Sequence, residues 1–216
     1  VLKFTHLRSL SLRQNKLKQI PRNIGQLNRL ESLDLIFNEI TQLPEQIGDL
    51  SNLKQLNISF NDLNSLPDGM TGLSRLEIIF MGENPDFKSR FPEVIFSLSS
   101  LKEIHASAGF FTEIPSSIKR LKDLHVLDLF NNDIVALPES IGSLTKLQTL
   151  DVSYNGLKTL PFSFGNLRSL VDLNAMENRL TSLPSTIGQL KNLKRLDLRG
   201  NRLQGLPLSL GKLKSL

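Results

Sequence analysis

The sequence predicts an α/β solenoid, a curved stack of about nine coils with a parallel sheet on the concave side and short helical or 3₁₀ segments on the convex side. Three observations predict this fold. A pattern of leucines returns every 23 residues through nearly the whole chain of 216 residues. An Asn recurs at one fixed place in the pattern, and an apolar-Pro step follows it. Repeats of this length indicate stacked units, each too small to bury its apolar side chains alone.

Each repeat follows the consensus LxxLxLxxNxLxxLPxxIGxLxx. The first half alternates near its end, which favours a short strand with leucines pointing inward and the residues between them pointing outward. The second half, LPxxIGxL, turns the chain back through a short helical or 3₁₀ segment. Successive coils open at Leu7, Leu30, Leu53, Leu76, Leu101, Leu124, Leu147, Leu170 and Leu193.

The recurring Asn is expected to end each strand inside the turn. Its amide can donate to and accept from the backbone of neighbouring coils, which satisfies groups that a buried turn would otherwise leave unpaired. The strand side packs more tightly than the helical side, so the stack is expected to curve with the sheet inside. The recurring residues are Asn15, Asn38, Asn61, Asn84, Asn132, Asn155, Asn178 and Asn201.

Across nine coils and nearly the full chain, these residues resemble the leucine-rich repeat family. Leu43-Pro44 and Ile47-Gly48, with their equivalents in other coils, are similar to the intracellular 23-residue class of that family. That class includes the Ras-binding scaffold and Ras-suppressor proteins, their plant intracellular relatives and the repeat region of fungal adenylate cyclases. The resemblance implies a protein-interaction surface, often in signalling, with a small GTPase or another signalling protein as partner.

Two adjacent coils, residues 76–123, depart from the consensus. The coil that opens at Leu76 runs 25 residues instead of 23, with two extra residues after Asn84, and the next coil has Gly109 in place of the Asn. One interpretation is a bulged loop over residues 83–90 that helps to grip a partner. The other is a repaired defect, in which a further contact replaces the Asn and the core is refilled by Phe87, Phe91 and Phe111.

The sequence predicts a single domain over residues 1–216. The chain begins late in a coil, with Phe4 at a core position, and stops as a new coil opens at Leu216. Neither end carries the polar cap that soluble arrays need. We therefore expect the chain to be a fragment of a longer array.

The concave face is the expected binding surface. We number the strand motif from its first leucine (position 1) to the Asn (position 9), and positions 3, 5, 7 and 8 should line this face or its rim. Apolar side chains fall there on consecutive coils, and exposed apolar surface with aromatics concentrates binding energy. Phe60 and Tyr154, directly before the Asn, can instead pack on the turn. The predicted partner-binding residues are Asp34, Ile36, Phe37, Asn57, Phe60, Ile78, Phe80, His105, Asp128, Phe130, Asp151, Tyr154 and Met176.

Charge is segregated between this face and the rest of the chain. The four face positions hold eight acids and three bases, an excess of five negative charges, whereas the chain has a net charge of +5. Phosphate backbones need clustered Lys and Arg, so the face is a poor nucleic-acid site. It suits a protein partner with basic and apolar residues. Asp34, Asp128 and Asp151 are expected to give charge selectivity, although Asp at position 5 also serves solubility.

No catalytic residue, metal site or cofactor is predicted. The sequence has no phosphate loop, HExxH, GxSxG or dinucleotide motif, and it has no Cys and only three His. His105 and Asp128 share position 5 of adjacent coils, so their side chains are expected to meet. Ser107 stands two residues further along, roughly 7 Å away, too far for a catalytic relay. A His–Asp contact on a binding face is therefore the preferred interpretation.

The composition bears on the compartment. Secreted arrays of this kind often close their ends with disulfide-bonded caps, and this chain has no cysteine, so we expect a cytoplasmic protein. The apolar runs are too short for a transmembrane segment. The first residues lack the features of a secretory signal.

The sequence thus predicts a scaffold or adaptor that binds a protein on its concave face, and not an enzyme. One alternative is the sensor or targeting region of a larger enzyme, such as a cyclase, kinase, phosphatase or ubiquitin ligase. Another is an immune or host-interaction receptor, which glycan on the sequon Asn57-Ile58-Ser59 would support. The oligomeric state stays open.

Overall fold

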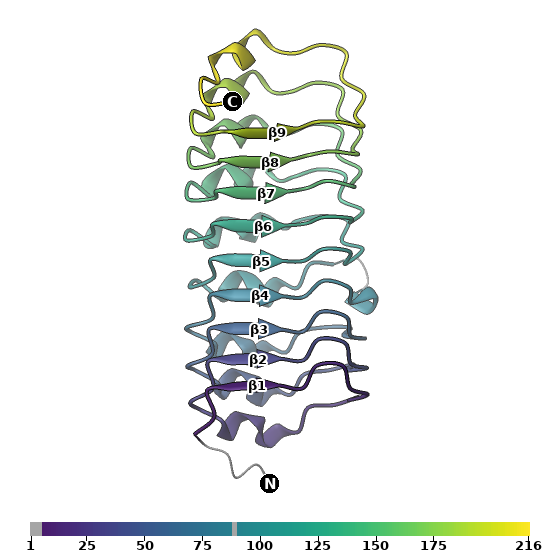
Figure 1. Ribbon diagram of the computed structural model, residues 1–216, viewed down its shortest axis with the longest axis vertical. Helices are drawn as coiled ribbons and strands as arrows, with labels where there is room; N and C mark the ends of the chain where they lie inside the picture. The colour runs from purple at the N-terminus through teal and green to yellow at the C-terminus, as the bar shows by residue number, and fades with distance from the viewer. Residues whose placement is uncertain (1–5, 88–89) are drawn as a thin grey trace.

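The computed structural model describes residues 6–87 and 90–216. Within this part of the chain, nine strands form one open, parallel sheet whose spatial order follows the sequence, so each coil adds one strand beside its predecessor (Figure 1). The strands occupy positions 3 to 5 of the motif. Their bounds are β1 (Ser9–Ser11), β2 (Ser32–Asp34), β3 (Gln55–Asn57), β4 (Ile78–Phe80), β5 (Glu103–His105), β6 (Val126–Asp128), β7 (Thr149–Asp151), β8 (Asp172–Asn174) and β9 (Arg195–Asp197).

The return half of each coil folds into a 3₁₀ helix directly after a Pro, as in η1, where Pro21 has φ −70° and ψ 147°. Figure 1 shows these helices behind the sheet, on the convex side. Among the described residues, no helix has the length and apolarity needed to cross a bilayer. The helices are η1 (Arg22–Gln26), η2 (Glu45–Asp49), η3 (Asp68–Gly72), η4 (Pro85–Phe87), η5 (Glu93–Ser97), η6 (Ser116–Arg120), η7 (Glu139–Ser143), η8 (Phe162–Asn166), η9 (Ser185–Gln189) and η10 (Leu208–Lys212).

The strands pair in a register that superposes equivalent positions, for example Leu33 on Leu56. Because side chains alternate along a strand, position 4 points inward and positions 3 and 5 point to the open face. Leu33 and Leu56 are fully buried, whereas Phe80 and Asp128 lie outside the leucine core. The predicted parallel ladder with inward leucines is confirmed.

The Asn side chains form the predicted ladder between coils. Asn61 Nδ2 donates to the Leu35 carbonyl oxygen of the preceding coil at 3.0 Å, and Asn61 Oδ1 accepts the Ile40 N–H at 3.0 Å. Equivalent bonds recur along the stack and satisfy the buried turns. They are made by Asn38, Asn61, Asn84, Asn132, Asn155, Asn178 and Asn201.

In the irregular coils, phenylalanine rings refill the core as predicted. Phe87, Phe91 and Phe111 are buried, and Phe111 lies 6.0 Å from Phe87 and 4.8 Å from Phe91 between ring centroids. Phe87 is placed by η4, the extra turn that the two inserted residues form. Residues 88 and 89 of the loop over 83–90 lie outside the described residues, as does Phe4, so a gripping role for this loop stays a prediction.

Candidate functional site on the concave face

Position 5 has a structural role that sequence analysis missed. In six coils its side-chain oxygen accepts the backbone N–H of position 7, as Asp128 Oδ1 does from Phe130 at 3.0 Å. The bond satisfies an amide that strand pairing leaves free. Asp34 and Asp128 therefore use one carboxylate oxygen for this local bond and keep the other for the open face, whereas the second oxygen of Asp151 accepts a hydrogen bond from Asn174. The six are Asp34, Asn57, Asp128, Asp151, Asn174 and Asp197.

Position 8 places aromatic rings on the rim of the face. Phe37 and Phe60 are both exposed, and their ring centroids lie 4.3 Å apart. Both residues have left-handed backbones, with φ of 56° and 54°, as does Glu83 at the same position. This conformation costs on the order of 1 kcal/mol for a bulky residue. Phe37 and Phe60 are each 41% exposed on this rim.

A second aromatic pair, Phe130 and Tyr154, lies further along the rim. The ring centroids are 5.4 Å apart with an edge-to-face angle of 71°, and Phe130 is 39% exposed. Sequence analysis missed Phe110 of the preceding coil, which is 50% exposed. Gly109, in place of the Asn, marked that coil as irregular but did not indicate where Phe110 would point.

The centre of the face combines an apolar pair with a histidine. Ile78 and Phe80 project from β4 and are half-buried, as are Ile36, just after β2, and Met176, just after β8. The rings of Phe80 and His105 stack, with centroids 4.4 Å apart and planes 11° apart. Two of the predicted partner-binding residues, on adjacent strands, are therefore in contact.

His105 lies between two carboxylates. Its Nε2 is 3.3 Å from Glu103 Oε2 on the same strand, and its Nδ1 is 3.7 Å from Asp128 Oδ2 on β6. Sequence analysis predicted the Asp128 contact but did not assign Glu103. Burial acts to lower the pKa of His105, but hydrogen bonds and charge from Asp128 and Glu103 outweigh it, so the pKa is raised from its ordinary value of 6.5.

The contact does not form a catalytic triad. Within the described residues, Ser107 makes no side-chain hydrogen bond to His105, and no group of three His, Asp or Glu is arranged to hold a metal ion. The His105 ring instead faces the open surface with its stacking partner. This arrangement can bind a side chain but offers no activated nucleophile.

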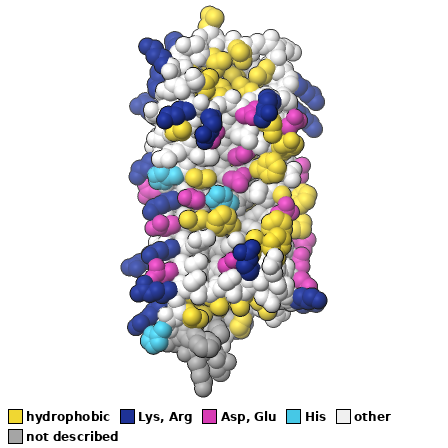
Figure 2. Space-filling model, in the orientation of Figure 1, with side chains coloured by type: hydrophobic (Ala, Val, Ile, Leu, Met, Phe, Trp, Pro, Cys, Tyr) yellow, Lys and Arg dark blue, Asp and Glu magenta, His cyan; other side chains and the backbone are white. Residues whose placement is uncertain are grey.

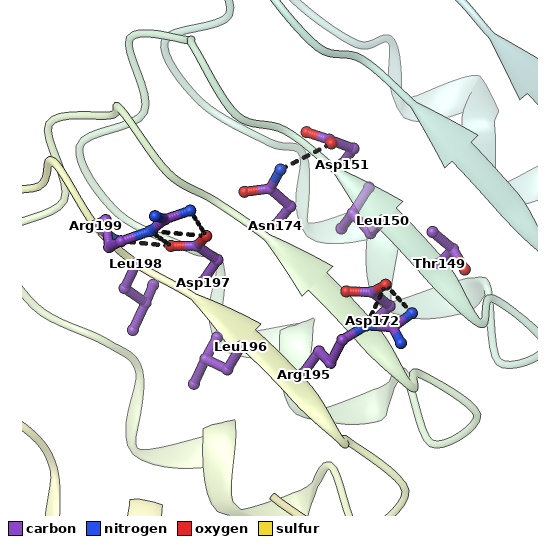
Figure 3. Close-up of a pocket in the computed structure, with 10 residues that line it drawn as sticks. All are labelled: Thr149, Leu150, Asp151, Asp172, Asn174, Arg195, Leu196, Asp197, Leu198 and Arg199. Atoms are coloured by element: carbon purple, nitrogen blue, oxygen red, sulfur yellow. Dashed lines mark hydrogen bonds and ion pairs between the residues drawn. The ribbon is translucent and has the colours of Figure 1, made fainter.

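Toward β9 the face contains an open hollow in which most charges are already paired (Figure 3). Arg195 bonds Asp172 through both Nε and a terminal nitrogen, and Arg199 does the same with Asp197. Asn174 donates to Asp151 Oδ2 at 2.9 Å. Two of the three bases counted on the face are thus neutralised here.

Of the six other acids on the face, four lie in the middle coils. Figure 2 shows acidic and histidine side chains among hydrophobic ones on the strand face, while Lys and Arg are most numerous along the left edge of the view and fewer on the face and right edge. Glu83, Glu103, Asp128 and Asp151 form no ion pair with Lys or Arg anywhere in the described chain. The segregation of charge inferred from the sequence is therefore strongest around His105.

The expectation that every residue at positions 7 and 8 lines the face is wrong. Ser59, Gly82 and Ser153 at position 7 are buried, and so is Ala108 at position 8. These side chains are small, so larger neighbouring side chains cover them. Ser153 Oγ instead donates to Asp151 Oδ1 at 2.5 Å.

Many solved structures resemble this fold, among them the following three. A leucine-rich repeat protein of Leptospira interrogans has a TM-score of 0.91 and 36% identity over 96% of this chain and 52% of that one. The ectodomain of the Arabidopsis thaliana receptor kinase GASSHO1/SCHENGEN3 has a TM-score of 0.76 and 32% identity, and the match covers 97% of this chain and 29% of the ectodomain. The leucine-rich repeat domain of the type III effector XopL has a TM-score of 0.85 and 27% identity, and the match covers 96% of this chain and 74% of that domain. The chain thus spans about half of the Leptospira protein and under a third of the plant ectodomain.

Family models agree with the structural likeness. The model of a leucine-rich repeat region matches residues 1–107 and 115–181, and a leucine-rich repeat model matches residues 192–213. No curated protein sequence matches the chain. Because the family match covers most of the sequence, the chain belongs to the leucine-rich repeat family.

Proposed function

We propose that this chain is a protein-interaction module that binds a partner protein on its concave face, as a scaffold or adaptor in intracellular signalling. The observation that carries the proposal is the aromatic surface of that face. Exposed pairs at Phe37–Phe60 and Phe130–Tyr154 flank the half-buried Phe80. Contiguous apolar surface rimmed by polar side chains marks interaction sites, and aromatic residues supply much of their binding energy.

The charge of the face favours a partner with basic and apolar residues. Asp34 and Asp128 each keep a carboxylate oxygen beyond the one bonded to the backbone, and neither pairs with Lys or Arg. Complementary charge speeds association and selects among partners. The same acidity disfavours nucleic acid on this face.

The proposed partner class and cellular location rest on the sequence and not on the geometry of the face. A small GTPase partner follows only from the resemblance of the LP and IG elements to the intracellular class of the family. A cytoplasmic location follows from the absence of cysteine in the chain. Detection of the endogenous protein in fractionated cells tests the location, and glycan on Asn57 would contradict it.

A second candidate is the ligand-sensing region of a larger protein. One similar structure is the ectodomain of a plant membrane receptor kinase, solved in complex with CASPARIAN STRIP INTEGRITY FACTOR 2. This chain spans only 29% of that ectodomain. The full-length reading frame separates the candidates, because a kinase, cyclase, phosphatase or ubiquitin-ligase domain in the same chain would favour the second.

Combined truncation of Phe80 and Phe130 to Ala tests the proposed function. Because both rings face the open surface, the free energy of unfolding should fall by about 1 kcal/mol or less per site. Binding should be lost, since interface aromatics carry much of the affinity. Phe162→Ala is the matched control, because Phe162 is 68% exposed on η8, on the opposite side of the stack.

The readout is quantitative capture of binding proteins by the immobilised chain, with unfolding followed in urea. A partner retained by the wild type and by the Phe162 variant, but not by the double variant, supports concave-face binding. Equal retention by all three would contradict it. A large loss of stability in the double variant would return both rings to a structural role.

A further inference from the structure

The coils that contain β4 and β5 lack a bond that other coils make. Where six coils have Asp or Asn at position 5, these two have Phe80 and His105. Neither ring accepts the position-7 N–H of its own coil, that of Gly82 or Ser107, in the described structure. A net hydrogen bond contributes about 1 kcal/mol. Phe80 and His105 therefore do not supply this bond, and they lie side by side at the centre of the open face.

Their surroundings define what could bind there. The Phe80–His105 stack presents a flat surface beside Glu103 and Asp128, whose side chains are 37% and 29% exposed. Glu83 lies in the same coil as Phe80, and Asp151 lies on β7, two coils beyond His105. None of these four carboxylates pairs with Lys or Arg in the described chain, and His105 is the cation nearest to Glu103 and Asp128. Half-exposed carboxylates that have no Lys or Arg partner are complementary to a cation delivered by another molecule.

We propose that an arginine or lysine side chain of the partner protein lies on the Phe80–His105 stack between Glu103 and Asp128, and that protonated His105 competes with it. This inference rests on the proposed binding of a protein to the concave face. It adds the chemical class of the central anchor and the condition that releases it.

The geometry favours a cation with a long apolar stem. Such a stem packs on aromatic rings while its charged end reaches carboxylates, and an aromatic face itself attracts a cation. Asp128 keeps Oδ2 for this contact because its Oδ1 accepts the Phe130 N–H. An acidic or purely apolar anchor would leave Glu103 and Asp128 desolvated without compensation.

Competition by His105 follows from the groups around its ring. Glu103 faces it from its own strand and Asp128 from β6, whereas β4 contributes only the apolar Ile78 and Phe80. When His105 is neutral, the two carboxylates attract a cation. When it is protonated, it satisfies both carboxylates itself and repels the incoming charge. Its raised pKa brings this change closer to neutral pH.

Peptide selection tests the inference. A random peptide library is selected on the immobilised wild-type chain and, in parallel, on the Phe80→Ala/Phe130→Ala variant. Peptides that bind only the wild type define those that need the concave face. We expect them to be enriched in Arg or Lys next to apolar residues, and the best of them becomes the probe for affinity measurements.

Isosteric variants then locate the cation. Asp128→Asn keeps the acceptor for the Phe130 N–H, as Asn57 does in its own coil, but removes the charge. Its affinity for the selected peptide should fall by about tenfold. Asp34→Asn makes the same change two coils away from the stack on β2 and should alter affinity by less than about twofold.

The pH dependence of the affinity for the selected peptide is the third test. Between about pH 7.5 and pH 5.5, wild-type affinity should fall several-fold, and in His105→Phe, which keeps a stacked ring, it should not. Face-dependent peptides without basic residues, or equal effects of Asp34→Asn and Asp128→Asn, would overturn this inference and leave the proposed function standing. If no selected peptide depends on the concave face, both fail.

Discussion

Asn132 Oδ1 accepts the backbone N–H groups of both Gly109 and Phe111, each at 3.0 Å. In the regular coils the equivalent Asn oxygen accepts one such group from the preceding coil, as Asn61 does from Ile40. Asn132 Nδ2 also donates to the Ala106 carbonyl oxygen at 3.0 Å. One side chain therefore supports its own turn and the turn in which Gly109 replaces the Asn.

Asn132→Ala should destabilise the fold strongly. The change leaves buried N–H and C=O groups without partners, each at about 1–3 kcal/mol. We expect a loss on the order of 3 kcal/mol in the free energy of unfolding, measured in urea. Asn15→Ala is the control, because Asn15 is exposed and bonds only its own turn, so it should cost less than about 1 kcal/mol. Similar losses in the two variants would argue against the double role of Asn132.

The adjacent rings Phe110 and Phe111 should respond oppositely to truncation. Phe111 is fully buried against Phe87 and Phe91, so Phe111→Ala should cost about 3–5 kcal/mol. Phe110 is half exposed, so Phe110→Ala should change stability by about 0.5 kcal/mol or less. Urea denaturation of both variants checks this. A large effect of Phe110→Ala would mean that this ring supports the irregular coil.

Most of the fold could be predicted from the sequence because the repeat fixes both the distance between equivalent positions and the residue type at each of them. A shift of 23 residues superposes Leu33 on Leu56, and the structure pairs these two residues in adjacent strands. The Asn at position 9 can pair with the backbone N–H and C=O groups of the neighbouring turn, so the hydrogen bonds between successive coils were predictable. Phe87, Phe91 and Phe111 were expected in the core because the irregular coils had lost apolar residues elsewhere.

The surface was predictable only in part. The period places Phe80 and His105 side by side, but it does not indicate that their rings stack or that Glu103 turns toward His105. Those contacts depend on side-chain torsion angles, which the spacing of the repeat does not determine. Position 8 has a left-handed backbone in each described coil, yet Phe60 is exposed and Ala108 is buried, so backbone conformation alone does not determine exposure there. The burial of Ser59 at position 7 depends on the size of its neighbours.

Folding stability should depend on pH through His105. Its pKa is raised in the folded chain, so protonation stabilises the fold. The contribution is complete below the unfolded value, near 6.5, and is lost as the pH rises through the higher folded value. The free energy of unfolding of the wild type relative to His105→Phe should therefore be greatest near pH 5.5 and decline toward pH 8.5, by about 1 kcal/mol or less.

The comparison with His105→Phe removes every contribution that the two chains share, so the difference reports on His105 alone. The direction is opposite to that expected for partner binding, which acid should weaken. A wild-type advantage that grows as the pH rises would show that His105 is not stabilised by Glu103 and Asp128.

Gly82→Ala should disturb both the fold and the proposed anchor site. A Cβ on Gly82 would lie 2.3 Å from the Ser107 carbonyl oxygen, a backbone atom that can move only with β5. Overpacking of this kind costs about 1–3 kcal/mol. Because β4 and β5 must separate to relieve it, the Phe80 and His105 rings should part, and the pKa of His105 measured by NMR should change. Gly205→Ala is the control, since nothing lies within 4 Å of its Cβ, and it should be neutral or stabilising by up to about 1 kcal/mol. An unchanged His105 titration in a destabilised Gly82 variant would show that the stack does not depend on the close approach of these two strands.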